Sequence, residues 1–251
     1  MITFNNLGQL GRLGNQLFQY ASLKGIAASN NQEFMVPKSE LFDYFKMSSA
    51  KIGRRNSPVF QEKNYHFDEE LFTKFQYDID LFGYFQSEKY FKHIENDIRR
   101  DFSFKEHIYE PCWEMIKDIP ERISLHVRRG DYLKKPDCHP PCTIEYYKEA
   151  LSKFDESIPV LIFGDDPQWC KEQDLFESDR FLVCETDSPY HDLYLMSQCE
   201  DFIIANSTFS WWGAWLCQND NKKVVAPSTW FGPNNQHHNI KDLFPETWIV
   251  L

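Results

Sequence analysis

Short apolar runs alternate with amphipathic segments throughout the second half of the chain. The apolar runs are rich in β-branched residues and predict strands at residues 123–127, 159–163, 180–184, 201–205 and 223–227. The segments between them show helical spacing and predict helices at residues 143–154, 167–174, 190–199 and 208–218. Strands that alternate with helices predict an α/β fold with a parallel, doubly wound sheet.

The first half of the chain has a less regular pattern. Residues 1–4 predict a strand, a glycine-containing loop follows, and residues 15–31 predict a helix with Asn15 as its N-cap. Residues 32–37 predict a second strand. The stretch from residue 39 to residue 118 is rich in Phe and Tyr, with helices expected near residues 68–75 and 89–104. The length of 251 residues allows either one large domain or two smaller ones.

Polar residues follow the predicted strands of the second half, in the sequences HVRRGD, FGDD, CETD and ANSTFS. In a parallel sheet these strand ends share one edge, where ligands bind. Arg128 and Arg129 end an apolar strand, and adjacent guanidinium groups are well shaped to hold phosphate oxygens. We therefore expect a diphosphate site, with one arginine on the phosphate and the other bracing the loop. Two surface salt bridges are the alternative.

Two further strand ends carry candidate ligand groups. Asp165 and Asp166 precede a proline that can open a helix, so we expect one of them to cap that helix and the other to accept a hydrogen bond from a ribose hydroxyl. Helix capping alone is the alternative. Asn206, Ser207 and Thr208 open the next helix and predict a phosphate-binding turn. They also spell an N-glycosylation sequon, which we discount because the chain shows no secretory signal.

The composition excludes several classes of protein. The formal net charge of −11 argues against a general nucleic-acid binder. No apolar run approaches the length of a membrane helix, and the first residues do not resemble a signal peptide, so we expect a cytoplasmic protein. Seven scattered cysteines indicate free thiols rather than a disulfide framework.

Two motifs raise the question of a metal. Asp78 and Asp80 form the DxD spacing with which many sugar-nucleotide enzymes hold a divalent cation. Cys138, His139 and Cys142 offer zinc ligands, but no second pair of matching spacing lies nearby. Chance carboxylate pairs are common in an acidic chain, so we expect no metal site.

Four stretches together resemble the α-1,2-fucosyltransferase family, especially its bacterial members of the family 11 type. They are GRLGNQLFQYA at residues 11–21, HVRRGDY at residues 126–132, FGDD at residues 163–166 and ANSTFSWWGAWL at residues 205–216. The resemblance spans nearly the whole chain, and HVRRGDY combined with NSTFSWWGA is its most specific part.

This resemblance implies a GT-B-like fold of two Rossmann-like lobes. Residues 1–120 would form the acceptor-side lobe with its glycine-rich loop, and residues 121–251 the lobe that binds GDP-fucose. It implies inverting transfer of L-fucose from GDP-β-L-fucose to the 2-hydroxyl of a terminal β-galactoside. No metal and no cofactor would be needed, since GDP-fucose is itself the donor substrate.

The resemblance also implies roles for individual residues. Arg128 would hold the β-phosphate, His126 and Asp192 would contact the guanosine part, and Ser207 and Thr208 would complete the diphosphate cradle. Asn15 would lie near the fucose and the attacking hydroxyl. Asp131 is a candidate base, with orientation of Arg129 as the alternative. The full expected set is catalytic Asn15, Arg128, Arg129 and Asp131, and donor-binding Gly14, His126, Asp165, Asp192, Asn206, Ser207 and Thr208.

Two other functions remain open from the sequence. One is a metal-dependent glycosyltransferase that uses Asp78 and Asp80 and another donor, and the other is a non-catalytic protein that binds a nucleotide or a glycan. The expected partners are GDP-fucose and a galactose-containing oligosaccharide or lipid-linked glycan, with no nucleic acid. The expected location is cytoplasmic, with at most a peripheral association with the inner face of the membrane.

Overall fold

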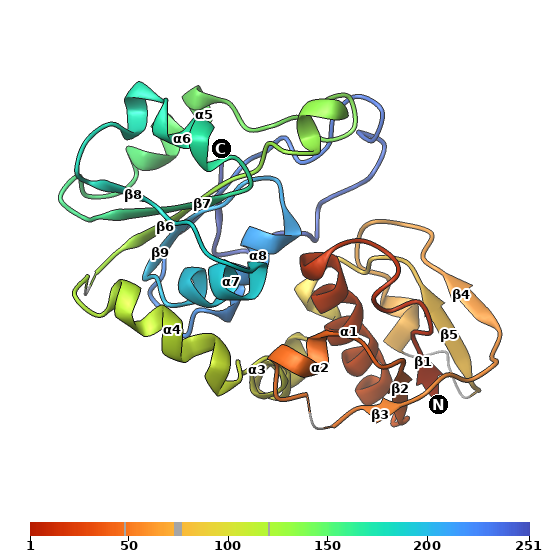
Figure 1. The fold of residues 1–251 in the computed structure, drawn as a ribbon. Coiled ribbons are helices and arrows are strands. Elements are labelled where there is room, and N and C mark those ends of the chain that lie inside the picture. Colours follow the sequence, from red (N-terminus) through yellow and green to blue (C-terminus); the bar gives the residue numbers. More distant parts are fainter. Residues whose placement is uncertain (48, 73–76, 120) are drawn as a thin grey trace. The chain divides into compact units, whose positions relative to one another are not determined.

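The computed structural model describes residues 1–47, 49–72, 77–119 and 121–251. The chain divides into two compact units, which we call unit 1 (Met1–Lys105 with His238–Pro245) and unit 2 (Glu106–His237 with Glu246–Leu251). Figure 1 shows the fold of each unit. The division lies between residues 105 and 106 rather than after residue 120, because helix α4 (Glu106–Ile116) packs against helix α7 (Pro189–Ser197) of unit 2.

The described residues of unit 1 form a parallel sheet with the strand order β3-β2-β1-β5-β4. Its strands are β1 (Ile2–Thr3), β2 (Phe34–Val36), β3 (Lys51–Ile52), β4 (Val59–Gln61) and β5 (Ile79–Phe82). Its α-helices are α1 (Leu13–Ser29), α2 (Leu41–Tyr44) and α3 (Glu95–Asp101). Its short 3-10 turns are η1 (Glu69–Phe72), η2 (Glu88–Tyr90) and η3 (Lys92–Ile94).

Helix α1 is buried on almost every side. It contacts β1 and β2, and it carries Lys24, whose ammonium lies 2.6 Å from the carboxylate of buried Asp101. The helix begins at Leu13 with Arg12 as its N-cap, so the expectation that Asn15 caps it is wrong. The left-handed turns lie at Gly8 and Gly11, whose φ angles are +85° and +78°, and they turn the chain into the helix early.

The aromatic stretch of unit 1 departs most from the sequence-based expectations. The helix expected at residues 89–104 is divided into η2, η3 and α3. Of the helix expected at residues 68–75, the structure shows the 3-10 turn η1, and residues 73–75 lie outside the described residues. The expected strands at residues 1–4 and 32–37 are present as the shorter β1 and β2.

Unit 2 contains a parallel sheet with the strand order β11-β10-β9-β6-β7-β8. Its strands are β6 (Ile123–Val127), β7 (Val160–Gly164), β8 (Phe181–Val183), β9 (Asp201–Ile203), β10 (Val224–Ala226) and β11 (Ile249–Val250). Its further helices are α5 (Ile144–Leu151), α6 (Pro167–Lys171) and α8 (Thr208–Leu216), with 3-10 turns η4 (Tyr132–Lys134) and η5 (Asp174–Phe176).

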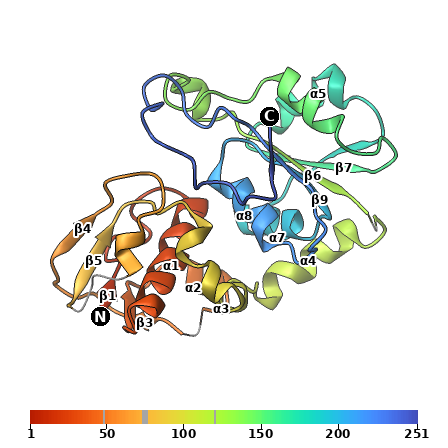
Figure 2. The ribbon, with the colours of Figure 1, turned by 180° about the vertical axis from the view of Figure 1, so that it is seen from behind.

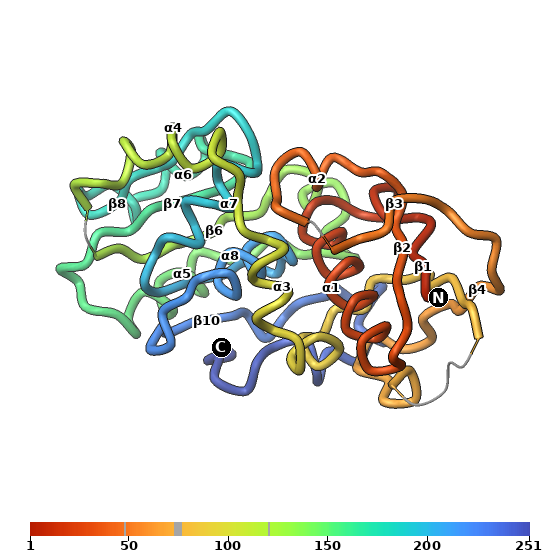
Figure 3. Tube along the Cα trace, turned by 90° about the horizontal axis from the view of Figure 1, so that it is seen from below, coloured from red at the N-terminus to blue at the C-terminus, as the bar shows by residue number. Residues whose placement is uncertain are grey.

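The sheet of unit 2 is covered on both faces. Helices α5 and α6 lie on one face, and α4, α7 and α8 lie on the other (Figures 1 and 2). The chain end pairs with β10 through β11, so the C-terminus lies beside β10 (Figure 3). The expected parallel, doubly wound sheet is therefore confirmed.

Helix α8 is part of the core of unit 2. Trp211 and Trp212 are fully buried and Trp215 is nearly so; their rings contact one another, and the Trp211 ring also contacts that of Trp248. These tryptophans pack the core rather than forming an exposed surface for sugars. Among the described residues, no helix is both long and apolar enough to cross a lipid bilayer.

Candidate functional site

The sequence HVRRGDY lies where the connections of the unit 2 sheet change direction. From β6 the chain proceeds outward through β7 and β8, and later returns to place β9 on the opposite side of β6. Ligands of doubly wound sheets bind outside the carboxyl ends of the strands at this position. Arg128 directly follows β6, and Asn206 follows the neighbouring β9. We therefore take this edge as the candidate site.

Arg128 is held between two carboxylates. Its Nη1 lies 2.7 Å from Oδ2 of Asp165, and its Nη2 lies 2.5 Å from Oδ1 of Asp131. The Arg128 side chain is 15% exposed, whereas Asp131 is 47% exposed and is the more accessible of the two acids. An anion that binds Arg128 would therefore displace Asp131 more readily than Asp165. Asp131 therefore pairs with Arg128 in the structure, and its expected role as a base remains a prediction.

Arg129 points to a different set of partners. Its Nε donates to Oδ2 of Asp166 at 3.2 Å, and its guanidinium lies 4.1 Å from the centre of the Trp169 ring. Asp166 also accepts from the backbone N–H of Trp169 as the N-cap of α6. Arg129 therefore braces the β6 loop against the start of α6, as expected for one of the two arginines.

Asp165 fixes the turn that follows β6. Its Oδ1 accepts from the backbone N–H of Arg129 at 2.8 Å and from that of Gly130 at 3.2 Å, while its Oδ2 pairs with Arg128. A Cβ atom at Gly130 would lie only 2.5 Å from that Oδ2. Both oxygens of Asp165 are thus engaged within the protein, so the geometry favours a role in shaping the turn over the expected ribose contact.

His126 lies on β6 beneath the turn. It is 3% exposed, its ring is 5.5 Å from that of Phe209, and Tyr147 donates to its backbone carbonyl at 3.1 Å. Burial, and secondarily the charge of Arg128, lowers the pKa of His126 to about 3, so the imidazole is neutral. Its buried Nδ1 has no hydrogen-bond partner among the residues that the structure describes.

Asp192 lies on α7, where its carboxylate accepts from the Thr186 hydroxyl at 2.8 Å. Burial raises the pKa of Asp192, and the hydrogen bond from Thr186 opposes that shift. A half-buried carboxylate of this kind is a good acceptor for ligand N–H groups. Its expected role toward guanosine remains a prediction.

Asn206 joins several segments of unit 2. Its Nδ2 donates to the carbonyls of Pro140 at 2.8 Å and Trp230 at 3.2 Å, and its Oδ1 accepts from the thiol of Cys142 at 3.7 Å. Its backbone carbonyl accepts from the Tyr132 hydroxyl at 3.0 Å. Because the side chain is 2% exposed and engaged at both ends, its geometry indicates that it positions the loops of the site rather than contacting a donor.

The two residues after Asn206 begin helix α8. Ser207 is its N-cap and accepts from the backbone N–H of Phe209 at 3.3 Å. Thr208 is the first helical residue and is partly exposed. The helix therefore starts at the candidate edge, as the phosphate-binding turn requires.

Gly14 and Asn15, expected near the donor, belong to unit 1. Both lie in the first turn of α1, so Gly14 is a buried helical residue and not part of the left-handed loop formed by Gly8 and Gly11. Asn15 accepts from Nε2 of Gln86 at 2.8 Å through its Oδ1. A Cβ at Gly11 would lie 2.3 Å from Nδ2 of Asn15, so the glycine loop encloses this amide closely.

The residues considered as metal ligands contact other protein groups in the structure. Asp80 is buried and accepts from the Thr3 hydroxyl and the Asn5 backbone N–H, both at 2.8 Å, and Asp78 pairs with Arg55. The ring of His139 stacks on Tyr132 at 5.0 Å. In the described parts of the chain, no group of three or more His, Cys, Asp or Glu side chains is placed to hold a metal ion.

Glu62 is a feature of unit 1 that sequence reasoning missed. Its carboxylate accepts from the backbone N–H groups of Tyr84 at 2.7 Å and Phe85 at 2.9 Å. Phe85 adopts a positive φ of 50°, an uncommon conformation for a bulky residue. Burial raises the pKa of Glu62 to about 7, against the effect of these two hydrogen bonds. No sequence motif surrounds Glu62, so only the fold reveals it.

Comparison with known proteins places this geometry in context. The sequence profile described as "Glycosyl transferase family 11" matches residues 2–251. An α-1,2-colitosyltransferase of Escherichia coli is 29% identical, with 96% of each chain covered. The O-antigen biosynthesis glycosyltransferase WbnK of Escherichia coli is 27% identical, over 96% of this chain and 98% of its own. Galactoside α-(1,2)-fucosyltransferase 2 of Oryctolagus cuniculus is 25% identical, over 98% of this chain and 76% of its own.

Solved structures resemble the fold at low sequence identity. The NodZ α-1,6-fucosyltransferase soaked with GDP-fucose superposes with a TM-score of 0.57 at 13% identity, covering 86% of this chain and 91% of its own. POFUT1 in complex with GDP-fucose gives a TM-score of 0.55 at 13% identity, covering 90% and 96%. These likenesses confirm the expected GT-B-type α/β fold.

Proposed function

Because the chain belongs to glycosyl transferase family 11, as the resemblance of its motifs predicted, we propose that this glycosyltransferase moves L-fucose from GDP-β-L-fucose to the 2-hydroxyl of a terminal β-galactoside, with inversion. The observation that carries the proposal is the position of Arg128. It extends from the central strand of the unit 2 sheet, at the edge where doubly wound sheets bind nucleotides, and it is held in place by Asp165.

The chemistry requires stabilisation of the leaving group. When the anomeric bond breaks, the electron pair goes to the GDP oxygen, and the sugar becomes an oxocarbenium-like cation. A fixed guanidinium aimed at the departing diphosphate stabilises this charge. In our proposal the diphosphate replaces Asp131 at Nη2 of Arg128, while Asp165 keeps Nη1 in place. The start of α8 at Ser207 and Thr208 adds backbone N–H donors to the cradle.

Neutral His126 and half-buried Asp192 suit the guanosine part in this proposal. Nδ1 of His126 is buried without a partner among the described residues, and a ligand group that pairs with it would remove the cost of an unsatisfied polar atom. Asp131, once displaced by the diphosphate, would be available to accept the proton of the attacking hydroxyl. We propose Asn15 as a contact to the sugar or the attacking hydroxyl. No metal or other cofactor takes part in these steps.

The relatives suggest the class of acceptor. One is named for O-antigen biosynthesis and others for galactosides, so we propose a galactose-containing oligosaccharide or lipid-linked glycan as acceptor. The proposed location is the cytoplasm, with at most a peripheral association with the inner face of the membrane. The colitosyl relative bears on the donor, because colitose is fucose that lacks one hydroxyl.

The test is a donor and acceptor panel. The purified protein is incubated with GDP-fucose or GDP-colitose and with a set of β-galactosides, in excess EDTA and without it. GDP release is measured, and the product linkage is read by NMR. We expect fucose on the galactose 2-hydroxyl at equal rates in both conditions. Transfer of colitose in place of fucose would contradict the proposed donor, and loss of activity in EDTA would contradict the metal-independent mechanism.

Replacement of Arg128 by alanine tests the site itself. We expect transfer to fall by about 10² to 10³, the effect of removing one well-aimed donor to a developing negative charge. Lys134→Ala removes an exposed cation from the same loop and is the matched control. Circular dichroism establishes that both variants remain folded. Near-normal turnover by a folded Arg128→Ala protein would refute the assignment.

A further inference from the structure

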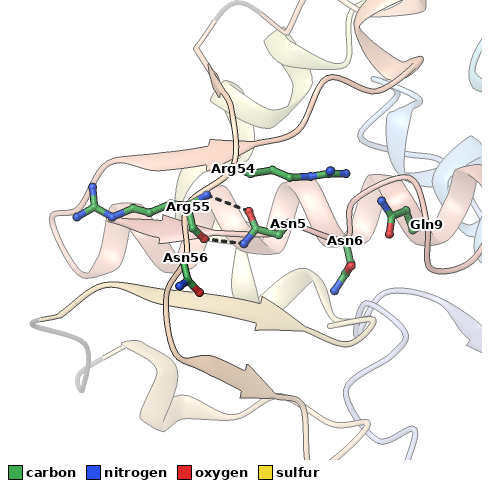
Figure 4. A pocket seen from close by; sticks show the side chains of 6 residues that line it. All are labelled: Asn5, Asn6, Gln9, Arg54, Arg55 and Asn56. Carbon is green, nitrogen blue, oxygen red and sulfur yellow. Dashed lines mark hydrogen bonds between the residues drawn. The ribbon is translucent and has the colours of Figure 1, made fainter.

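Unit 1 contains a polar pocket at the carboxyl end of its central strand. The pocket measures about 370 Å³ and lies between the loop that follows β1 and the segment that joins β3 to β4 (Figure 4). Its size lies within the range of sites that bind small ligands, roughly 300 to 1,000 Å³. The residues that line it are Asn5, Asn6, Gln9, Arg54, Arg55 and Asn56.

Part of this lining forms a fixed frame. The Asn5 side chain donates from Nδ2 to the Arg55 carbonyl at 2.8 Å and accepts from the Arg55 backbone N–H at 3.3 Å (Figure 4). Buried Asp80 holds the Asn5 backbone N–H at 2.8 Å. The Arg55 guanidinium points away from Asn5 and pairs with Asp78, outside the lining. These contacts join the two loops without using the remaining polar groups.

The other lining side chains offer donors to a ligand. Among the described residues, the structure shows no hydrogen bond or ion pair for the side chains of Arg54, Asn6, Gln9 or Asn56. The Arg54 side chain extends toward the end of the pocket where Asn6 and Gln9 lie (Figure 4). The lining contains guanidinium and carboxamide groups and no carboxylate, although the whole chain has a net charge of −11.

This chemistry selects a particular kind of ligand. Carboxamides can both donate to and accept from sugar hydroxyls, and a guanidinium without a partner binds a carboxylate or phosphate with two parallel hydrogen bonds. A local cationic site on an acidic protein attracts a small anion while the rest of the surface repels it. We propose that this pocket is a subsite for an anionic group of the acceptor glycan, either the carboxylate of an acidic sugar or the phosphate of a lipid-linked glycan. The proposal rests on the proposed function for its acceptor.

The experiment compares three acceptors that share a terminal β-galactose. Lactose is the neutral probe, galactosyl-β-glucuronic acid carries a carboxylate, and a galactosyl-β-N-acetylglucosamine with a reducing-end alkyl diphosphate carries phosphate. Initial rates give kcat/KM for each acceptor with the wild-type protein and with Arg54→Ala. The matched control is Lys51→Ala, which removes an exposed cation on β3 that pairs with Glu33 and does not line the pocket.

We expect Arg54→Ala to lower the ratio of kcat/KM for an anionic acceptor over lactose by about tenfold, the loss expected for a charged hydrogen bond. Lys51→Ala should leave the ratio within about twofold, because its charge acts only at long range. The acceptor whose ratio falls identifies the source of the anion. An unchanged ratio for both anionic acceptors, in a protein that transfers fucose, would overturn the inference.

Direct binding separates this outcome from failure of the proposed function. Isothermal titration of the same two anionic acceptors, without donor, should show weaker binding to Arg54→Ala than to the wild-type protein and to Lys51→Ala. If the wild-type protein consumes no GDP-fucose, the proposed function fails, yet loss of binding in Arg54→Ala would still support an anion site. If turnover is normal and binding is equal in all three proteins, the pocket is not an acceptor subsite.

Discussion

Replacement of Asp165 separates two tasks that one carboxylate performs. Oδ1 accepts from the backbone N–H groups of Arg129 and Gly130, and Oδ2 pairs with Arg128. Asp165→Ala removes all three contacts. Asp165→Asn is isosteric and keeps an oxygen for the two backbone N–H groups, but it places an amide N–H₂ against Nη1 of Arg128. The asparagine variant should therefore preserve the turn and release the arginine.

The magnitudes follow from the contacts. Hydrogen bonds to a charged group contribute about 1.5 to 3 kcal/mol each, and the 26% exposure of Asp165 places these at the low end. With about 1.5 kcal/mol for each of the two backbone hydrogen bonds and at most about 1 kcal/mol for the partly exposed ion pair, we expect Asp165→Ala to lose about 3 to 4 kcal/mol of unfolding free energy, and Asp165→Asn about 1 kcal/mol. Both variants should lose at least about tenfold in kcat/KM for the donor, because Arg128 is no longer held toward the leaving group.

Urea denaturation and steady-state kinetics measure the two effects separately. Asp131→Asn is the matched control, because it removes the other carboxylate from Arg128 and leaves the Oδ1 contacts of Asp165 intact. We expect this control to be nearly as stable as the wild-type protein. The reasoning would be refuted if Asp165→Asn were as unstable as Asp165→Ala, or if it turned over donor at the wild-type rate.

Two further predictions concern stability and the turn. Burial raises the pKa of Glu62 from 4.5 to about 7. Between these two pH values the folded state keeps a proton on Glu62 that the unfolded state releases. The stability that this proton contributes is therefore lost as the pH rises from about 4.5 to about 7. We expect the unfolding free energy of Glu62→Gln, measured by urea denaturation, to fall less between about pH 5 and about pH 7 than that of the wild-type protein. If it falls equally in both proteins, other groups cause the pH dependence of stability. Gly130→Ala would place a methyl 2.5 Å from Oδ2 of Asp165. We therefore expect weaker binding of GDP, measured by titration, and a lower midpoint of thermal unfolding. A GDP affinity and a thermal midpoint equal to those of the wild-type protein would show that the turn accommodates the methyl group.

Much of unit 2 could be predicted from the sequence because its strands are continuous apolar runs. Strand β6 is buried along its whole length, and such runs separated by amphipathic helices are easily recognised. Unit 1 was harder because β3 has only two residues and β4 only three, too few for any periodicity. Helix α4 was missed because Pro111 lies inside it, and a proline normally indicates the end of a helix.

The candidate site could be predicted only in part for a related reason. The positions of Arg128 and Ser207 follow from strand ends, which a sequence can show. The partners of a polar side chain depend on segments distant in the chain, so the engagement of Asn206 by Pro140 and Trp230 could not be anticipated. The pocket around Arg54 was also missed, because it combines residues from two loops with no common motif.

The division of the chain has a consequence for the order in which the protein folds during synthesis. Asp242 pairs with Lys89 at 2.6 Å and accepts from the backbone N–H of Phe67, yet it is made only after most of unit 2. Unit 1 therefore cannot complete its contacts during synthesis until residues 238–245 have emerged from the ribosome, although most of it is made first. A nascent chain arrested before residue 238 lacks both contacts of Asp242, so we expect protease to cleave its unit 1 faster than unit 1 of the full chain.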